Sequence, residues 1–509
     1  MFFIKDTERN FSIAKTDRLK FAGNIILSGI IAMTAISCGG NSMPPGDAPE
    51  GWIGSYDRLR VDNLGLLRNT FENEVVLRGV NLGGWLFHEA WMGPFSGSSG
   101  GDGGWAMSDT ISALDSRFGE TERTALINSY EENFITEEDF MWFKEEGINC
   151  LRIPFWYRNF MSNDTGAWLG DNGRQPVTNN PGFLRLDWVI DQAKQRGIYV
   201  ILDLHGAPGG QSSNHSTGTL NRNQLWTSSQ YEQATVELWK SIAMRYKNQA
   251  AVAAYDLLNE PMNGGAWQPG SPRAVFETVR VYDRLYREIR AIDSETIIMM
   301  EAIWHMPNLP NPNIVYSGTP VTPGNLSGSG EIGNHNSASA PQWGGKKAAW
   351  HNVIYSMHLY DRSNGSLDWQ INNLVSARNN WKVGIHAGEF ENGDIQVYAY
   401  NKMNENKISW NKWTYKIAGR NLGAWSLIQK AGHPSVDIQN SSIDDIRAAF
   451  GAGLRTFNPG TTKLASGWSL QTADGKWLPA FRTAMKHAIS GVFTNSNQKG
   501  FPAGGWLNP

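Results

Sequence analysis

The feature that most constrains the fold of this chain is a regular alternation of two kinds of segment. From about residue 70 onward, short apolar runs rich in β-branched residues alternate with longer segments of helical period. The runs are apolar at nearly every position, as expected for strands buried on both faces of a parallel sheet. The alternation therefore predicts repeated βα units, and eight such runs predict an α/β fold of the (β/α)8 TIM barrel type.

The predicted elements follow this alternation along the chain. The strands are expected at Val75–Asn81, Cys150–Pro154, Tyr199–His205, Ala253–Asn259, Thr296–Glu301, Ile354–Tyr360, Val383–Glu389 and Gly423–Leu427. The helices are expected at Glu137–Glu146, Leu186–Arg196, Gln230–Tyr246, Arg273–Ala291, Leu367–Trp381, Tyr398–Asn404 and Pro479–Ile489. No helix is evident after the fifth strand, because residues 306–348 are rich in Pro, Gly, Ser and Asn.

Long insertions are predicted on one face of the barrel. Each follows a predicted strand, and they lie at Met92–Met107, Gly206–Arg222, Met306–Trp350 and Ala431–Leu478. Segments that follow barrel strands lie on the C-terminal face, where the active sites of such barrels form. A length of 509 residues is compatible with one large barrel. We predict a catalytic domain over residues 55–490 and an irregular tail at residues 491–509.

The first 54 residues are predicted to be a secretion signal and a tether. An apolar stretch at residues 21–37 follows two basic residues and is short for a membrane span, which favours a signal peptide over residues 1–37. Cys38 then stands in what resembles a bacterial lipoprotein box, and a hydrophilic Gly/Pro-rich tether is expected at residues 38–54. The alternatives are an ordinary signal peptide or a membrane anchor in which Cys38 has no role.

These features predict a secreted bacterial lipoprotein on the outer membrane or cell surface, with the periplasmic side as the alternative location. Contact with the membrane is expected through the lipid anchor only, and the protein is expected to be a monomer. The only other cysteine, Cys150, lies in an apolar run and is expected to be a buried free thiol without a function.

Charge and aromatic content narrow the classes of partner. The formal net charge is −3, and no run of Lys and Arg follows the first twenty residues, so nucleic acid is not expected as a partner. The 22 Trp outnumber both the 15 Tyr and the 21 Phe, and flat apolar rings with one polar group suit the faces of sugars. Packing in a large barrel core is the alternative explanation. We expect a polysaccharide or oligosaccharide partner.

Polar side chains gather at the C-terminal ends of the predicted strands, where packing alone does not explain them. They are Asn81, Arg152, Asp203, His205, Asn259, Glu260, Glu301, His358, Tyr360 and Glu389. If the strands close into a barrel, these side chains converge on one pocket.

Two of these carboxylates suit the hydrolysis of a glycosidic bond. The reaction needs a proton donor for the leaving oxygen and a second group facing the developing oxocarbenium ion. Glu260 lies in YDLLNEP and Glu389 in VGIHAGEF. An acid must hold its proton near neutral pH, whereas a nucleophile must stay ionised, which Arg152 and Tyr360 are placed to enforce. A separation of roughly 5 Å predicts retention of configuration, and about 6.5–9.5 Å predicts inversion.

Six motifs in order carry a resemblance to glycoside hydrolase family 5, within the clan of (β/α)8 cellulases. They are RGVNLGGWLFHEAWM (Arg78–Met92), YEENFITEEDFMWFKEEGINCLRIP (Tyr130–Pro154), DLHGAPGGQ (Asp203–Gln211), LLNEP (Leu257–Pro261), HLY (His358–Tyr360) and GEF (Gly388–Phe390). The chain looks most like the exo-β-1,3-glucanase branch. The resemblance spans roughly residues 75–430 and implies a retaining β-glycosidase that forms a glycosyl-enzyme intermediate.

The resemblance assigns catalytic roles position by position. It implies that Glu260 is the general acid/base and that Asn259 beside it hydrogen-bonds the sugar 2-OH. It implies that Glu389 is the nucleophile, oriented by Arg152 and Tyr360.

The resemblance also implies contacts with the sugar. His205 and His358 would line the −1 subsite, Trp425 would stack under the sugar there, and Glu89 would bind hydroxyls of the terminal glucose. No metal and no other cofactor is implied.

Structural roles are the alternatives at several of these positions. Arg152 could pair with a structural carboxylate, and His205 could be a satisfied core histidine because Asp203 lies on the same face of the strand. Asn259 could be a turn residue, and Tyr360 could belong to the core.

The chain departs from the branch in the rim loops and in the last strand. After GAPGGQ the branch usually shows Asn-Gly-Phe-Asp-Asn, whereas this chain has Ser212-Ser213-Asn214-His215-Ser216, and Ala90 replaces a proline. The family's last strand usually reads Trp-x-Trp-Lys, and the strand predicted here has no second ring after Trp425. A β-1,3-glucan is therefore the favoured substrate, with a cellulase or mannanase acting on β-1,4-linked polysaccharide as the alternative.

Two other classes of function remain alternatives. A non-catalytic glycan-binding lipoprotein would be favoured by loss of Glu260 or Glu389, and both are present. A transglycosylase would use the same two residues and pass the glycosyl group to a sugar instead of water.

Overall fold

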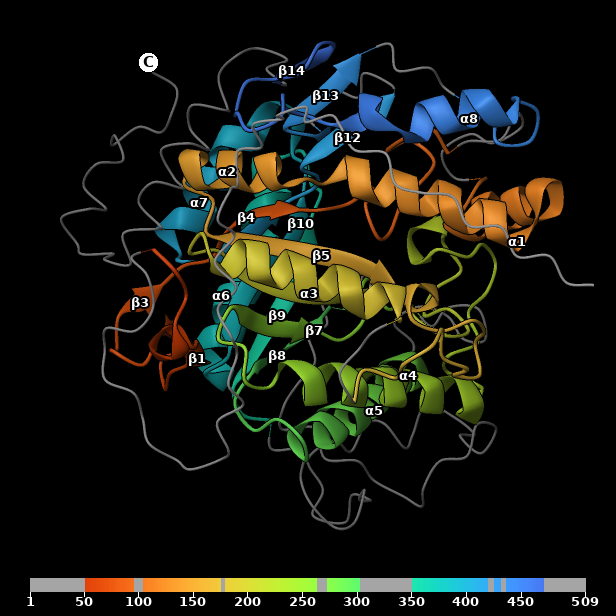
Figure 1. Cartoon of the computed structure of the whole chain (residues 1–509). Helices are drawn as coiled ribbons and strands as arrows, with labels where there is room; N and C mark the ends of the chain where they lie inside the picture. The colour runs from red at the N-terminus through yellow and green to blue at the C-terminus, as the bar shows by residue number, and fades with distance from the viewer. Residues whose placement is uncertain are drawn as a thin grey trace, which may run out of the picture. The chain divides into compact units, whose positions relative to one another are not determined.

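The centre of the structure, a computed structural model, is a closed barrel of eight parallel strands in the order β10-β11-β4-β5-β6-β7-β8-β9 (Figure 1). The structure describes residues 51–95, 104–174, 179–262, 272–302, 350–419, 425–431 and 436–470. The barrel strands are β4 (Arg78–Asn81), β5 (Cys150–Trp156), β6 (Tyr199–Gly206), β7 (Val252–Asp256), β8 (Ile297–Glu301), β9 (Val353–Leu359), β10 (Gly384–Phe390) and β11 (Ser409–Lys412). The predicted (β/α)8 barrel is confirmed.

Seven of the eight predicted strands overlap barrel strands, because these strands are buried from end to end. Every residue of β5, β6 and β7 is buried, as a strand needs to be when it has side-chain layers inside the barrel and helices outside. An apolar run is therefore a sound signal for such a strand.

The prediction of the eighth strand at Gly423–Leu427 is wrong. The barrel is closed by β11, which pairs with β10 and β4, and three of its four residues are polar but buried. Asn411 is 2.8 Å from the Nε2 atom of His386, and Lys412 Nζ donates to the carbonyl oxygens of Phe390 and Trp413 at 3.1 and 2.7 Å. A search for apolar runs misses a strand whose polar side chains find partners inside the barrel.

The helices of the outer ring are largely as predicted. They are α2 (Glu137–Glu146), α3 (Pro181–Lys194), α4 (Ser229–Tyr246), α5 (Pro272–Arg290), α6 (Asn364–Trp381) and α7 (Gln396–Glu405). Thr136 caps the N-terminus of α2, and its backbone N–H donates to Asp139 Oδ2 at 2.7 Å. The predicted helix Pro479–Ile489 and the region after β8 lie outside the described residues.

A long helix between β4 and β5 was not predicted. Helix α1 (Met107–Phe134) is mostly polar, buries few of its residues and is interrupted at Gly119, where φ is +81°. Its apolar positions are therefore too sparse to give a clear helical period. Helix α8 (Ile443–Phe450) packs against α1 (Figure 1).

In the part of the chain that the structure describes, two small sheets lie outside the barrel. One is antiparallel and consists of β1 (Arg60–Val61), β2 (Leu67–Arg68) and β3 (Glu74–Val75). The other consists of β12 (Lys416–Gly419), β13 (Ile428–Ala431) and β14 (Trp468–Leu470). The insertion predicted at Ala431–Leu478 therefore contains regular structure, namely α8 and β14.

Several predictions concern residues outside the described ranges. The leader at 1–37, Cys38, most of the tether and the tail at 491–509 lie outside the described residues and stay predictions. Among the helices that the structure describes, none has the length and apolar character needed to cross a bilayer. Cys150 is a buried free thiol, and burial raises its pKa to about 12, as expected of an inert side chain.

Candidate active site

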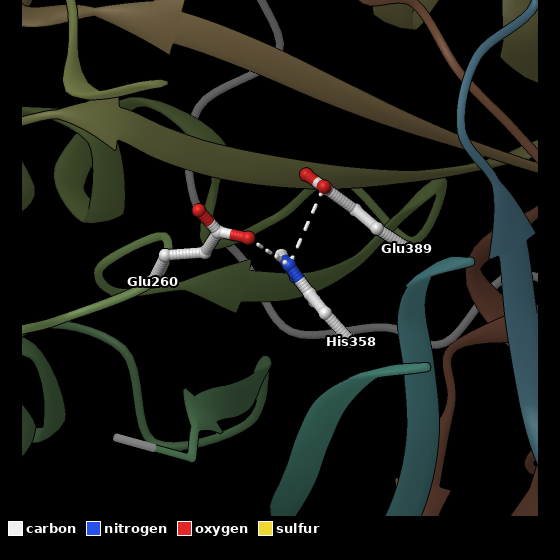
Figure 2. Close-up of side chains that lie close together, drawn as sticks. All are labelled: Glu260, His358 and Glu389. Atoms are coloured by element: carbon white, nitrogen blue, oxygen red, sulfur yellow. Dashed lines mark hydrogen bonds and ion pairs between the residues drawn. The ribbon is translucent and has the colours of Figure 1, made fainter. Parts of the chain in front are cut away.

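Polar side chains from the C-terminal ends of the barrel strands converge on one buried centre. Glu260, which follows β7, lies with His358 of β9 and Glu389 of β10 so that one ligand atom of each is within 4.8 Å of the others (Figure 2). His358 Nδ1 is 2.8 Å from Glu260 Oε1 and 3.3 Å from Glu389 Oε2. One carboxylate oxygen of Glu260 and one of Glu389 therefore lie within 4.8 Å of each other.

A local irregularity of β10 aims Glu389 at this centre. The pairing of β10 with β9 shifts register between Ala387 and Glu389. Such bulges redirect side chains beside active sites. Gly388 occupies the bulge, where a Cβ atom would lie 2.6 Å from Ser356 Oγ and 3.0 Å from His358 Nε2. The close packing therefore requires glycine before Glu389.

The guanidinium of Arg152 holds the base of the site together. It is fully buried, and each of its three nitrogens contacts an acceptor. Its contacts are Asn81 Oδ1 at 3.0 Å, Glu389 Oε1 at 2.9 Å, Asp256 Oδ2 at 2.9 Å, Asn259 Oδ1 at 2.9 Å, Glu301 Oε1 at 2.8 Å and Asp203 Oδ2 at 3.1 Å. Burial alone would lower the pKa of Arg152, but the four carboxylates outweigh it and keep the side chain charged.

The four carboxylates around Arg152 do not share one protonation state. Burial raises the pKa of Asp203 and Asp256 well above the ordinary value, which favours their neutral forms. Burial also opposes ionisation of Glu301, but the charges of His358 and Arg152 outweigh it and lower its pKa to about 2. Negative charge is therefore concentrated on the side of the cluster that faces His358.

Both oxygens of Glu389 are held. Oε1 accepts from Arg152 at 2.9 Å, and Oε2 accepts from the hydroxyl of Tyr360 at 2.7 Å. Burial raises the pKa of Glu389, and the charges of His358 and Arg152 offset this rise only in part. From the sequence, Arg152 and Tyr360 are expected to keep this side chain ionised. Both contact it, but burial has the larger effect on its pKa.

Glu260 has a different environment and an unusual backbone. Its Oε1 contacts His358, and its Oε2 accepts from Ser216 Oγ at 3.2 Å; no arginine among the described residues is paired with it. Burial raises its pKa. Its φ is +43°, a region that residues with a Cβ rarely adopt, and its N–H donates to Glu301 Oε2 at 2.7 Å. Such conformations persist where surrounding contacts enforce them, and they cluster at functional sites.

The two predicted histidines have opposite charge states. Burial lowers the pKa of His205 to about 3, and its Nδ1 is 2.7 Å from Asp203 Oδ2, the partner expected if it were a satisfied core residue. Burial alone would also lower the pKa of His358, but Glu301 and Glu389 outweigh it and hold that pKa well above the ordinary value. His358 is therefore the cation between the two catalytic candidates.

Asn259 is more than a turn residue. Its Oδ1 accepts from Arg152, while its Nδ2 is buried and has no hydrogen-bond partner among the described residues. A buried donor without a partner is unfavourable unless a ligand satisfies it. This geometry fits the predicted contact with a sugar hydroxyl.

The tryptophan that directly follows the last barrel strand is Trp413, which the sequence analysis missed. Trp413 follows β11, is buried, and its ring lies parallel to that of His205, with 5.3 Å between ring centroids. The signal that could have found it is the segment Trp413-Thr414-Tyr415-Lys416, which matches the family pattern with a tyrosine as its second ring. Trp425 instead packs against Tyr360 and Trp91, with centroids 5.5 and 5.8 Å away.

One oxygen of Glu89 contacts the ring nitrogens of two side chains. Its Oε2 accepts from Trp91 Nε1 at 3.1 Å and lies 2.6 Å from His215 Nε2. Trp91 contacts Trp425, which contacts Tyr360, so side-chain contacts connect Glu89 to Glu389. The structure thus brings every predicted substrate-binding residue into one connected cluster.

The three side chains in Figure 2 also meet the distance condition for a cation site. Their contacts do not suit one. Both oxygens of Glu389 already accept hydrogen bonds, and His358 carries a positive charge that would repel a cation. We assign these residues no metal.

Comparisons with known proteins point to one family. The sequence model of cellulase (glycosyl hydrolase family 5) matches residues 116–419. A β-xylosidase of Phanerodontia chrysosporium is 32% identical over 230 residues, 45% of this chain and 43% of that protein. A probable glucan 1,3-β-glucosidase A of Aspergillus fumigatus is 30% identical over 237 residues, 46% of this chain and 51% of that protein. The chain spans about half the length of these curated relatives.

Solved structures align over a larger part of the chain but less closely. A rutinosidase from Aspergillus niger has a TM-score of 0.47 at 14% identity, covering 67% of this chain and 90% of that one. An endo-glycoceramidase II from Rhodococcus sp. has a TM-score of 0.43 at 16% identity, covering 77% of this chain and 80% of that one.

Replacing Arg152 tests its place in this cluster. We expect Arg152→Met to lower the free energy of unfolding by about 3–5 kcal/mol at pH 7, because buried carboxylates lose their counter-charge. The stability that Glu301 contributes is present above its ordinary pKa of 4.5 and is lost as the pH falls through about 2. The gap between wild type and variant should therefore narrow as the pH falls.

Urea unfolding across a pH series measures this gap. The matched control is Arg174→Met, which removes a half-exposed ion pair with Glu237 and should cost less than about 1 kcal/mol. A gap for Arg152→Met that is equally small, or that does not change with pH, contradicts the electrostatic role of Arg152.

Proposed function

The chain belongs to glycosyl hydrolase family 5, and from this premise we propose that it is a retaining β-glycosidase that hydrolyses a β-glucan, with β-1,3-linked glucan favoured. The observation that carries the mechanism is the approach of Glu260 and Glu389, each of which has an oxygen within 4.8 Å of the other. At that distance one carboxylate reaches the anomeric carbon while the other reaches the leaving oxygen.

In the first step Glu389 attacks the anomeric carbon and the glycosidic bond breaks. Glu260 gives its proton to the leaving oxygen at the same time, so the alcohol leaves neutral. The contacts of Arg152 and Tyr360 hold both oxygens of Glu389 in place for the attack. The products of this step are the leaving alcohol and a glycosyl ester of Glu389.

In the second step Glu260, now ionised, takes a proton from water, and the water oxygen attacks the anomeric carbon. The ester bond breaks and Glu389 leaves as a carboxylate. Esterification removes the charge of Glu389, which otherwise disfavours a second charge nearby. Ionised Glu260 is therefore better tolerated in the intermediate than in the free enzyme, which suits its change from acid to base.

Other side chains of the cluster would bind the sugar at the reacting position. Asn259 Nδ2 is a buried donor without a partner and would meet the 2-OH. Trp413 takes the place under the sugar that the sequence analysis gave to Trp425, because Trp413 follows the last barrel strand. Glu89 would accept from hydroxyls of the terminal sugar, with His205 and His358 lining the subsite.

The preference for β-1,3-glucan rests on relatives rather than on the catalytic pair. A glucan 1,3-β-glucosidase of Blumeria graminis is 34% identical over 38% of this chain and 43% of that protein. The altered rim loops leave a β-1,4-glucan or β-mannan as the alternative. Product analysis on a panel of glucans and mannans distinguishes these substrates.

The location of the protein is proposed from the sequence alone. The apolar stretch at residues 21–37 and Cys38 support export as a lipid-anchored protein. This proposal is independent of the catalytic mechanism.

The function predicts a specific loss at Glu389. We expect Glu389→Ala to lower kcat by at least about 10⁴-fold with the fold intact, because no side chain can then form the ester. Azide should restore turnover and yield a glycosyl azide of inverted configuration, seen by NMR. Glu391→Ala, two residues along, is the matched control. Ordinary activity of Glu389→Ala would contradict the assignment.

The function predicts a different pattern at Glu260. We expect Glu260→Gln to slow phenyl glycosides about 100-fold or more and 2,4-dinitrophenyl glycosides far less in the first step, because only poor leaving groups need protonation. Burial raises the pKa values of Glu389 and Glu260. In the pH profile of kcat/KM for the wild type, the apparent pKa values of the acidic and alkaline limbs should therefore both lie above the ordinary pKa of Glu. The alkaline limb should be absent in Glu260→Gln. Equal losses on both leaving groups would contradict the acid role.

A further inference from the structure

Two neighbouring residues of a rim loop hold two different carboxylates of the site. In the short 3-10 helix His215–Thr217, His215 Nε2 lies 2.6 Å from Glu89 Oε2, and Ser216 Oγ donates to Glu260 Oε2 at 3.2 Å. Figure 2 shows that the other oxygen of Glu260 faces His358. One turn of backbone therefore joins the predicted sugar-binding carboxylate to the predicted proton donor.

The turn is firmly anchored. Thr217 is buried, and its hydroxyl donates to the carbonyl oxygens of Asn214 at 2.9 Å and Ser212 at 3.3 Å. Gly218, with φ of +83°, closes the turn by donating its N–H to His215 O at 2.9 Å. The carbonyl of Gly218 accepts from Ser108 N of α1 at 2.9 Å. The positions of His215 and Ser216 are thus fixed relative to the barrel.

The link to Glu89 depends on the type of residue at position 215. A histidine can donate to Glu89, whereas a carboxylate at this position would face Glu89 with a like charge.

The contact between His215 and Glu89 leaves one oxygen of Glu89 available to a sugar hydroxyl. Trp91 Nε1 and His215 Nε2 both contact Oε2, which uses its two lone pairs. No described residue hydrogen-bonds Oε1. A sugar hydroxyl can therefore donate to Oε1 while Oε2 stays fixed to the turn.

We propose that the turn His215–Thr217 is a clamp that fixes Glu89 and Glu260 relative to each other, so that a terminal sugar seated at Glu89 meets the proton donor in place. His215 and Ser216 are positioning residues, which act through Glu89 and Glu260 respectively. The inference rests on the proposed function and deepens it. The substrate class it implies is a β-glycoside whose non-reducing terminal sugar carries a hydroxyl that donates to Glu89.

The clamp is tested with variants that break each link. His215→Ala and Ser216→Ala are compared, alone and together, on phenyl and 2,4-dinitrophenyl β-glucosides. Each single variant should lower kcat/KM, which reports the first step, about 10–100-fold for the phenyl glucoside and less than about 3-fold for the activated glucoside, because only the former needs a well-placed proton donor in that step. The double variant should be no slower than the slower single variant, since both break one connection.

Matched variants separate positioning from folding. Ser213→Ala alters the same loop at a side chain without a hydrogen bond to Glu89 or Glu260, and it should leave kcat unchanged. Ser216→Thr keeps the hydroxyl and His215→Gln keeps a donor, so both should recover most of the phenyl glucoside rate. Thermal unfolding of every variant should match wild type within a few degrees.

The experiments distinguish failure of the clamp from failure of the proposed function. Equal losses on both glucosides, a change confined to KM, or additive effects in the double variant would overturn the clamp while leaving the proposed function standing. A wild-type protein inactive on both aryl glucosides and on all the β-glucans and mannans of the panel would overturn the proposed function, and the clamp with it.

Discussion

The interaction on which the site depends is the contact of one buried guanidinium with acceptors from five barrel strands or their ends. Arg152 touches side chains that come from β4, β6, β7, β8 and β10, and these meet only because the barrel closes. Its charge compensates carboxylates that could not otherwise be ionised in this interior. The fold and the chemistry therefore share one constraint. Without barrel closure, Arg152 and the carboxylates would be far apart. Without Arg152, the closed barrel would bury carboxylates that lack the counter-charge of the guanidinium.

The same cluster makes the two carboxylates proposed for catalysis unlike. Glu389 accepts hydrogen bonds from Arg152 and Tyr360, which hold both of its oxygens, whereas the described partners of the Glu260 carboxylate are His358 and Ser216. A carboxylate held at both oxygens is suited to attack from a fixed position. One with a single serine on its outer oxygen can exchange a proton. The difference in partners, more than the direction of the pKa shifts, separates the proposed nucleophile from the proposed acid.

The sequence predicted what depends on apolar patterning and on motif order, and it failed where polar groups are buried. Seven barrel strands and Glu260 with Glu389 could be located because strands buried on both faces are apolar and the carboxylates follow them. The eighth strand, Ser409–Lys412, was not predicted because it contains Lys412, whose ammonium group is hydrogen-bonded inside the barrel. Trp413, which follows this strand, was missed for the same reason. The contact of His215 with Glu89 joins residues far apart in the chain, which no local pattern can reveal.

The central claim is that Glu389 forms a covalent bond to the sugar. The most direct test is to incubate the protein with 2,4-dinitrophenyl 2-deoxy-2-fluoro-β-glucoside, which slows breakdown of a glycosyl ester, and to map the label by peptide mass spectrometry. The account predicts one fluoroglucosyl group per chain, on the peptide that carries Glu389. Label on Glu260, or an unlabelled protein that turns over glucoside with inverted products, would contradict it.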